Sequence, residues 1–129
     1  MEAKAAYVHH GKGTVRAYVF GRLDLLDFAK QVFGAVELER NAVANGFHVQ
    51  AQIGDSVVVL SVSEPPYEKA GKATVYVYVE DVDATYERAL KAGATRLDGP
   101  RERPWKARMG GVQDSFGNTW YIETYHGPS

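Results

Sequence analysis

Side chains suited to binding or catalysis recur at every second position in four short stretches of this sequence. They are Arg16 and Tyr18, His48 and Gln50, Tyr76 and Tyr78, and Tyr121 and Glu123. Because consecutive side chains of a β-strand point to opposite faces, each pair is expected to share one face of a sheet. An arginine holds a carboxylate or phosphate with two parallel hydrogen bonds, and tyrosines offer stacking area and hydroxyl groups. This combination is typical of a site that binds an organic molecule.

Two of these residues, His48 and Glu123, also have the chemistry of an acid–base pair or of two metal ligands, provided that the fold brings them together. Trp105 is a further binding candidate, because an aromatic side chain on a loop has no core to join. Each residue also has a structural explanation. A lone strand histidine is more often hydrogen-bonded than catalytic, tyrosines fit any pleated surface, and a buried Glu123 can form an internal salt bridge with Arg16.

These stretches belong to a pattern of strands and helices that occurs twice along the chain. The first copy has a strand at 14–19, a helix at 23–33 and a hairpin at 47–62; the second has a strand at 74–79, a helix at 81–92 and further strands to 125. Each helix ends in Gly-Ala, at Gly34 and again at Gly93, where a helix C-terminus favours glycine. Two copies of a strand–helix–multistrand unit predict an α+β fold with mainly antiparallel sheet.

Length and composition limit the function classes. The 129 residues, 45% of them hydrophobic and 24% charged, predict a single compact domain over residues 1–129. A net charge of -1 supplies no general attraction to nucleic acid or to an anionic membrane, so neither is expected as a partner. The chain has no cysteine, which excludes disulfides and thiolate metal sites and is compatible with the expected cytoplasmic location.

The second copy carries a recognisable set of motifs. It contains the segment Val77–Ala84, then Ala92-Gly93-Ala94, and then GVQDSFGNTW at 111–120. In this order and spacing they resemble the second half of proteins of the vicinal oxygen chelate superfamily, which includes glyoxalases, bleomycin-resistance proteins and extradiol dioxygenases. The nearest resemblance is to the PhnB-like, glyoxalase-like branch, over about residues 14–125. One departure is Ser115, where the family usually has proline.

The resemblance implies an architecture and an assembly. It implies two βαβββ modules, at about 14–63 and 73–125, joined by a linker at 64–72 that contains Pro65 and Pro66. Their mixed, mainly antiparallel sheets would curve around a cavity, with the helices on the outer face. Because such proteins are often homodimers, a homodimer is also expected.

The resemblance further implies a divalent metal held by strand residues that face the cavity. The equivalent positions here are Thr14, Thr74, Tyr121 and a residue within 59–61. None is His, Asp or Glu, and hydroxyl groups are poor ligands for transition metals. We therefore predict no metal cofactor. The adjacent His9 and His10 lie in an N-terminal segment without a sustained pattern, and they are not expected to bind a metal either.

We predict a metal-free protein that binds a small aromatic or conjugated organic molecule, in the manner of drug-sequestering resistance proteins. The expected ligand-binding residues are Arg16, Tyr18, His48, Gln50, Tyr76, Tyr78, Trp105, Tyr121 and Glu123. The intervening apolar residues should pack beneath the helices; they are Val15, Ala17, Val19, Val75, Val77, Val79, Trp120 and Ile122. Two alternatives remain: a lyase or isomerase that uses His48 and Glu123 with or without a divalent metal, and a structural or interaction module whose cavity is filled.

Overall fold

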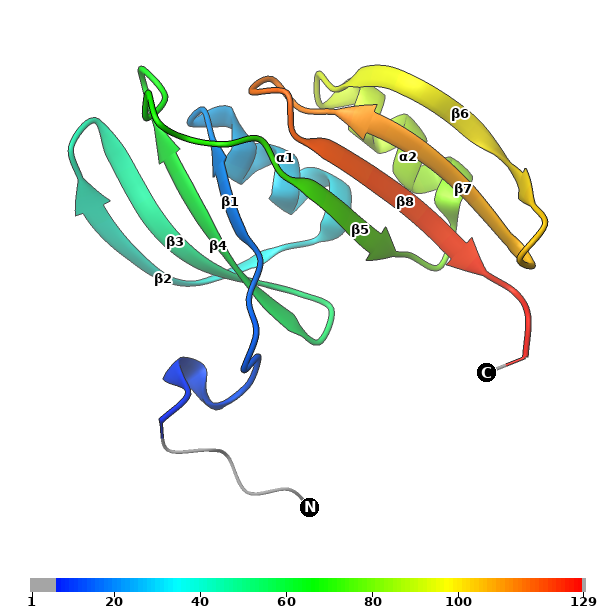
Figure 1. Cartoon of the computed structure of the whole chain (residues 1–129), viewed down its shortest axis with the longest axis horizontal. Helices are drawn as coiled ribbons and strands as arrows, with labels where there is room; N and C mark the ends of the chain where they lie inside the picture. Colours follow the sequence, from blue (N-terminus) through cyan, green and yellow to red (C-terminus); the bar gives the residue numbers. More distant parts are fainter. Residues whose placement is uncertain (1–6, 129) are drawn as a thin grey trace.

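The structure, a computed structural model, describes residues 7–128 and consists of two similar halves side by side (Figure 1). The first half contains the 3-10 turn η1 (His9–Gly11), β1 (Tyr18–Gly21), α1 (Asp24–Phe33), β2 (Val36–Val43), β3 (Gly46–Ile53) and β4 (Ser56–Ser63). The second contains β5 (Thr74–Tyr78), α2 (Val82–Lys91), β6 (Thr95–Arg103), β7 (Ala107–Gln113) and β8 (Thr119–Tyr125). Both halves therefore run β-α-β-β-β.

Each half forms its own four-stranded sheet, with strand orders β1-β4-β3-β2 and β5-β8-β7-β6. The first strand of each half pairs in parallel with the last, and the other neighbours are antiparallel. The predicted α+β class and the two βαβββ modules are confirmed. The sheets do not close into one continuous wall, because β1 and β5 remain edge strands of separate sheets.

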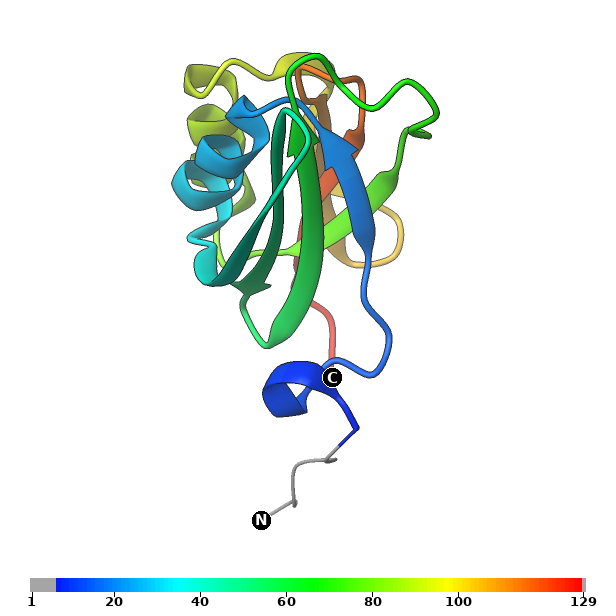
Figure 2. The same ribbon diagram turned by 90° about the vertical axis from the view of Figure 1, so that its left-hand side faces the viewer.

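Both helices lie on the same side of the sheets (Figure 2). Helix α1 turns an apolar face to the core through Leu25, Phe28 and Val32, and Gly34 ends it with a left-handed φ of 65°, a conformation that glycine adopts without strain. Helix α2 is capped by Asp81, whose side chain accepts a hydrogen bond from the Ala84 backbone N–H at 3.1 Å. No helix of residues 7–128 is long and apolar enough to cross a bilayer.

The predicted apolar set divides into three groups. Val19, Trp120 and Ile122 are buried under the helices as expected. Val15 is 90% exposed, which contradicts the prediction; the strand begins at Tyr18, so no helix covers the residues before it. The apolar side of β5 is only half-buried, because β5 is an edge strand beside the boundary between the halves.

The two halves are joined through the turn that precedes β8. Asn118 is fully buried, and its side-chain amide donates to the carbonyl oxygen of Phe20 in β1 at 2.7 Å. Its amide oxygen accepts from the backbone N–H of Ala73 at 2.8 Å. Asp114 holds the turn by accepting from Asn118 and from the indole of Trp120, both at 2.9 Å. The DSFGN motif is therefore a structural clamp between the halves.

Candidate functional site

Five of the predicted binding residues come together on the face of the second sheet that points away from α2. We call this group the aromatic face; it consists of Tyr76, Tyr78, Trp105, Tyr121 and Glu123. The parallel register of β5 and β8 places Tyr76 beside Tyr121 and Tyr78 beside Glu123. The Tyr76 ring centroid lies 5.5 Å from that of Tyr78 and 6.2 Å from that of Tyr121. Alternation along both strands explains why these side chains share one face.

Glu123 lies at the base of the aromatic face and is only 2% exposed. One carboxylate oxygen, Oε1, accepts hydrogen bonds from the indole N–H of Trp105 at 2.8 Å and from the Tyr76 hydroxyl. Arg16 pairs elsewhere, so the internal Arg16–Glu123 salt bridge considered from the sequence is not formed. Among the described residues no arginine, lysine or histidine lies within salt-bridge distance of Glu123. The carboxylate is thus buried beside neutral donors only.

This environment also changes the chemistry of Tyr76. Burial of the hydroxyl, and next its hydrogen bond to the Glu123 carboxylate, raise the pKa of Tyr76 from 10.0 to about 12. The hydroxyl therefore stays protonated at neutral pH and keeps donating to Glu123. In this pair Tyr76 is the hydrogen-bond donor and Glu123 is the acceptor, so Tyr76 does not supply a reactive phenolate.

The remaining predicted residues lie on the corresponding face of the first sheet. We call Arg16, Tyr18, His48 and Gln50 the first-sheet polar face. The Tyr18 hydroxyl lies 3.4 Å from His48 Nε2, and Arg16 donates to Gln50 Oε1 at 2.8 Å. Arg16 also donates to backbone carbonyls of the loop before β1, including that of Lys12 at 2.9 Å. All three nitrogens of its guanidinium therefore already donate hydrogen bonds within the chain.

His48 and Glu123 lie on different sheets and have different partners, namely Tyr18 for the histidine and Tyr76 with Trp105 for the glutamate. The chain alone does not assemble them into an acid–base pair. The aromatic face is not covered by the chain's own side chains either. Tyr78 is 69% exposed and Trp105 is 47% exposed, so the aromatic face is open to a ligand.

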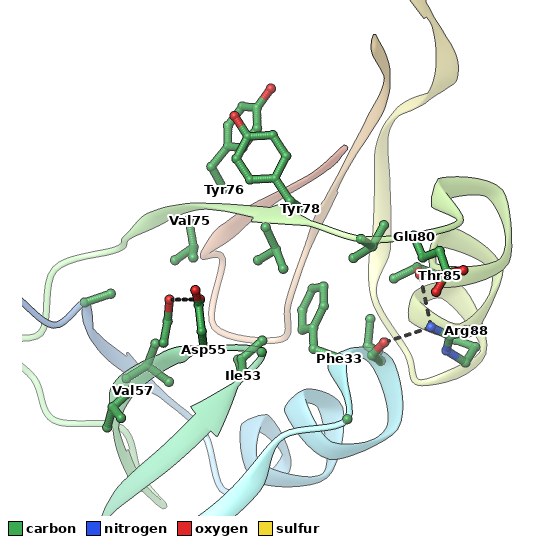
Figure 3. Close-up of a pocket in the computed structure, with 18 of the residues that line it drawn as sticks. Phe33, Ile53, Asp55, Val57, Val75, Tyr76, Tyr78, Glu80, Thr85 and Arg88 are labelled. Carbon is green, nitrogen blue, oxygen red and sulfur yellow. Dashed lines mark hydrogen bonds between the residues drawn. The ribbon is translucent and has the colours of Figure 1, made fainter. Parts of the chain in front are cut away.

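A hollow that the sequence did not predict lies at the boundary between the halves, on the other side of β5. It has a volume of about 810 Å³ and its walls include Val57, Val75 and Phe33 (Figure 3). Figure 3 shows the side chains of Tyr76 and Tyr78 projecting from the opposite side of the strand. The valines that alternate with these tyrosines indicated that β5 has an apolar side. Alternation does not show whether a helix covers that side, so the hollow was not predicted.

The hollow offers apolar contact area, with charged groups at its rim. One of them, Arg88, already donates to the Val32 carbonyl at 3.2 Å and to the Thr85 hydroxyl at 3.0 Å, and so links α2 to the end of α1. The walls of the hollow also include Asp55, Ser56, Glu80 and Asp81. The side chains of Tyr76 and Tyr78, in contrast, project to the aromatic face (Figure 3).

The metal that the resemblance implies does not fit the residues at its inherited positions. Thr74 and Tyr121 occupy the positions on β5 and β8, and Val59–Ser61 occupies the position on β4. None supplies an imidazole or a carboxylate, the ligands that zinc, nickel and iron prefer. Glu123, the nearest carboxylate on β8, is held by Tyr76 and Trp105 instead.

The comparisons with known proteins agree with the fold. The sequence model of the glyoxalase/bleomycin resistance protein/dioxygenase superfamily matches residues 24–122. The chain belongs to this superfamily. It is 34% identical over 110 residues to the uncharacterized protein Mb0911c of Mycobacterium bovis, a match that covers 75% of this chain and 72% of the relative. The equally similar Rv0887c of Mycobacterium tuberculosis is matched over 64% of its length. The narrower resemblance to the PhnB-like branch stays a prediction.

Two solved structures illustrate the likeness in fold. TioX from Micromonospora sp. ML1 has a TM-score of 0.67 at 24% identity, covering 87% of this chain and 99% of TioX. The fosfomycin resistance protein FosX from Listeria monocytogenes has a TM-score of 0.64 at 14% identity, covering 89% and 94%. At these identities the likeness is one of fold, so the function has to be argued from the site.

Proposed function

We infer that this superfamily member binds a flat, conjugated organic molecule with a positively charged group on its aromatic face, and that it sequesters this molecule without chemical change. The observation that carries the proposal is the buried Glu123 carboxylate beneath exposed aromatic rings. The fosfomycin resistance protein among the structural neighbours is consistent with a role in resistance to a toxic compound. The inference rests on the side chains of this chain.

The charge of the ligand follows from the environment of Glu123. A carboxylate buried without a cationic partner is costly, and two neutral donors compensate only part of that cost. A ligand cation that approached the carboxylate would add a charge-assisted interaction. Tyr76 and Trp105 stand beside the carboxylate, and the faces of tyrosine and tryptophan rings attract cations as well.

The shape of the ligand follows from the aromatic rings. The Tyr76 ring lies 5.5 Å from the Tyr78 ring and 6.2 Å from the Tyr121 ring, both in tilted arrangements, and the Trp105 indole donates to the carboxylate beneath them. Rigid aromatic side chains supply large contact area at low cost in conformational entropy. A flat conjugated molecule matches this surface, whereas a compact aliphatic one leaves most of it in water.

The proposal is tested by calorimetric titration with 9-aminoacridine, a flat aromatic cation, as the probe. Trp105→Ala and Tyr76→Ala should each weaken binding by about tenfold, since a stacked aromatic contributes about 1–3 kcal/mol. Tyr7→Ala is the matched control, because Tyr7 is also an exposed tyrosine but lies outside the aromatic face. Equal losses in all three variants, or no binding by the unaltered protein, would refute the aromatic face as the site.

We also propose that the protein is a homodimer. Edge strands β1 and β5 support this, as do exposed apolar side chains such as Tyr18 and Val36, because unpaired edges and apolar surface favour association. Light scattering measures the mass in solution: a dimer gives twice the chain mass of 14.2 kDa. A mass of one chain at all concentrations would contradict this part of the proposal.

A further inference from the structure

A second cluster of chemically active side chains lies apart from the aromatic face, at the open edge of the first sheet. It consists of His9 and His10 from η1 and Glu39 from β2, the edge strand of that sheet. One ligand atom from each residue lies within 4.8 Å of the other two, and no other group of three His, Cys, Asp or Glu residues within 7–128 meets this spacing. Both histidines approach one oxygen, Glu39 Oε1, His9 Nε2 at 2.7 Å and His10 Nε2 at 3.6 Å.

The backbone directs two consecutive histidines to the same side. Consecutive side chains of an extended segment point apart, but here the ring centroids lie only 4.0 Å apart. His10 has a left-handed φ of 65°, which is uncommon for any residue other than glycine. The guanidinium of Arg16 stabilises this turn by donating to the carbonyl oxygens of His9 and Lys12. The pair is therefore presented by a turn with several internal hydrogen bonds.

One coordinating atom of the cluster has no partner, which points to an additional ligand. His10 Nε2 is a buried nitrogen with no hydrogen-bond partner, and such a group is costly to leave unsatisfied. Asn41 donates to Glu39 Oε2 at 2.9 Å, so the other carboxylate oxygen faces the histidines. An outer hydrogen bond of this kind orients a carboxylate ligand in protein metal sites.

We propose that His9, His10 and Glu39 form a binding site for a divalent transition-metal ion, with Zn²⁺ as the best match. Tetrahedral zinc with nitrogen and oxygen ligands places the ligand atoms about 3.3 Å apart, and the present separations of 2.7 and 3.6 Å bracket that value. The ion takes the place of the direct hydrogen bond between His9 and Glu39, because a ring nitrogen coordinates a metal through its free lone pair. Three protein ligands leave a fourth position for water.

The proposal departs from the sequence-based expectation for His9 and His10, which did not include the third ligand from a strand about thirty residues away. The site is also separate from the inherited positions on β5 and β8. A bound ion would connect the N-terminal segment to β2. Because Arg16 connects the same segment to Gln50 on β3, the ion would also hold Arg16 in place on the first-sheet polar face.

The test is calorimetric titration of the untagged 129-residue chain with Zn²⁺. The unaltered protein should bind one ion per chain, and His10→Gln and Glu39→Gln should each weaken binding by about tenfold or more. His126→Gln is the matched control, because His126 forms a similar exposed pair with Glu102 at 2.8 Å but has no second histidine beside it. This variant should bind Zn²⁺ like the unaltered protein.

Cobalt supplies a second measurement that does not depend on affinity. Co²⁺ in the same site should give the intense visible absorption of tetrahedral coordination, and His10→Gln should lose it while circular dichroism shows an unchanged fold. Absence of Zn²⁺ binding by the unaltered protein would overturn the proposal. So would a Zn²⁺ affinity of His10→Gln and Glu39→Gln equal to that of the unaltered protein, or a loss of affinity in His126→Gln as large as in these two variants. The Trp105→Ala variant should bind Zn²⁺ normally, which separates this proposal from that for the aromatic face.

Discussion

Replacing Asn118 with alanine should loosen the connection between the two halves of the fold. The side chain is fully buried and bonds to the Phe20 carbonyl, the Ala73 N–H and the Asp114 carboxylate. Truncation leaves the two backbone groups without partners, at about 1–3 kcal/mol each for a fully buried group. Because Phe20 and Ala73 are only half-buried, water will replace part of the loss. We expect the free energy of unfolding to fall by about 2–4 kcal/mol.

Urea denaturation followed by circular dichroism measures this loss. The midpoint should fall while the dependence on urea stays unchanged, because the surface exposed on unfolding is the same. Asn41→Ala is the matched control: Asn41 is exposed, and its side chain donates to the Glu39 carboxylate. It should change the unfolding free energy by about 0.5 kcal/mol or less. If Asn118→Ala lost less than about 1 kcal/mol, the hydrogen bonds of Asn118 would not contribute to holding the halves together.

Two further predictions concern local chemistry and packing. The pKa of Tyr76 is about 12 in the folded chain and 10.0 for an ordinary tyrosine, so the unfolded chain loses this proton first and stability falls as pH rises through that interval. Urea denaturation across this range should show a shallower fall for Tyr76→Phe; an equal fall would contradict the assigned environment. Gly46→Ala should unfold the chain or destabilise it by about 3 kcal/mol or more, because a Cβ there would lie 1.8 Å from the Val62 carbonyl oxygen. Gly71→Ala, with open space around it, should be nearly neutral in thermal unfolding, and a similar effect of both changes would refute the packing argument.

Local sequence signals predicted most of the fold. The helix of residues 23–33 and the strand of residues 47–53 match α1 and β3 closely, because hydrophobic period and the glycine at the helix end act over a few residues. The first strand was placed too early. The alternation of Val15 and Ala17 continues ahead of β1, and alternation alone does not show where pairing with a neighbouring strand begins.

The aromatic face was predictable for the same reason, since alternation fixes which side chains of β5 and β8 share a side. What the sequence did not show are contacts between distant segments. Arg16 was expected to grip a ligand, but its guanidinium bonds to Gln50 and to loop carbonyls. The contact of Trp105 with Glu123 likewise depends on the path of the loop between β6 and β7. No periodicity encodes such contacts.

The direct test of the central claim is whether Glu123 selects a cationic ligand. Calorimetric titration with 9-aminoacridine and with neutral acridine, which has nearly the same shape, gives the ratio of the two affinities. The unaltered protein should prefer the cation by about tenfold. Glu123→Gln, which keeps the side-chain shape, should bring the ratio close to one. An unchanged ratio in this variant would show that the buried carboxylate does not recognise the ligand.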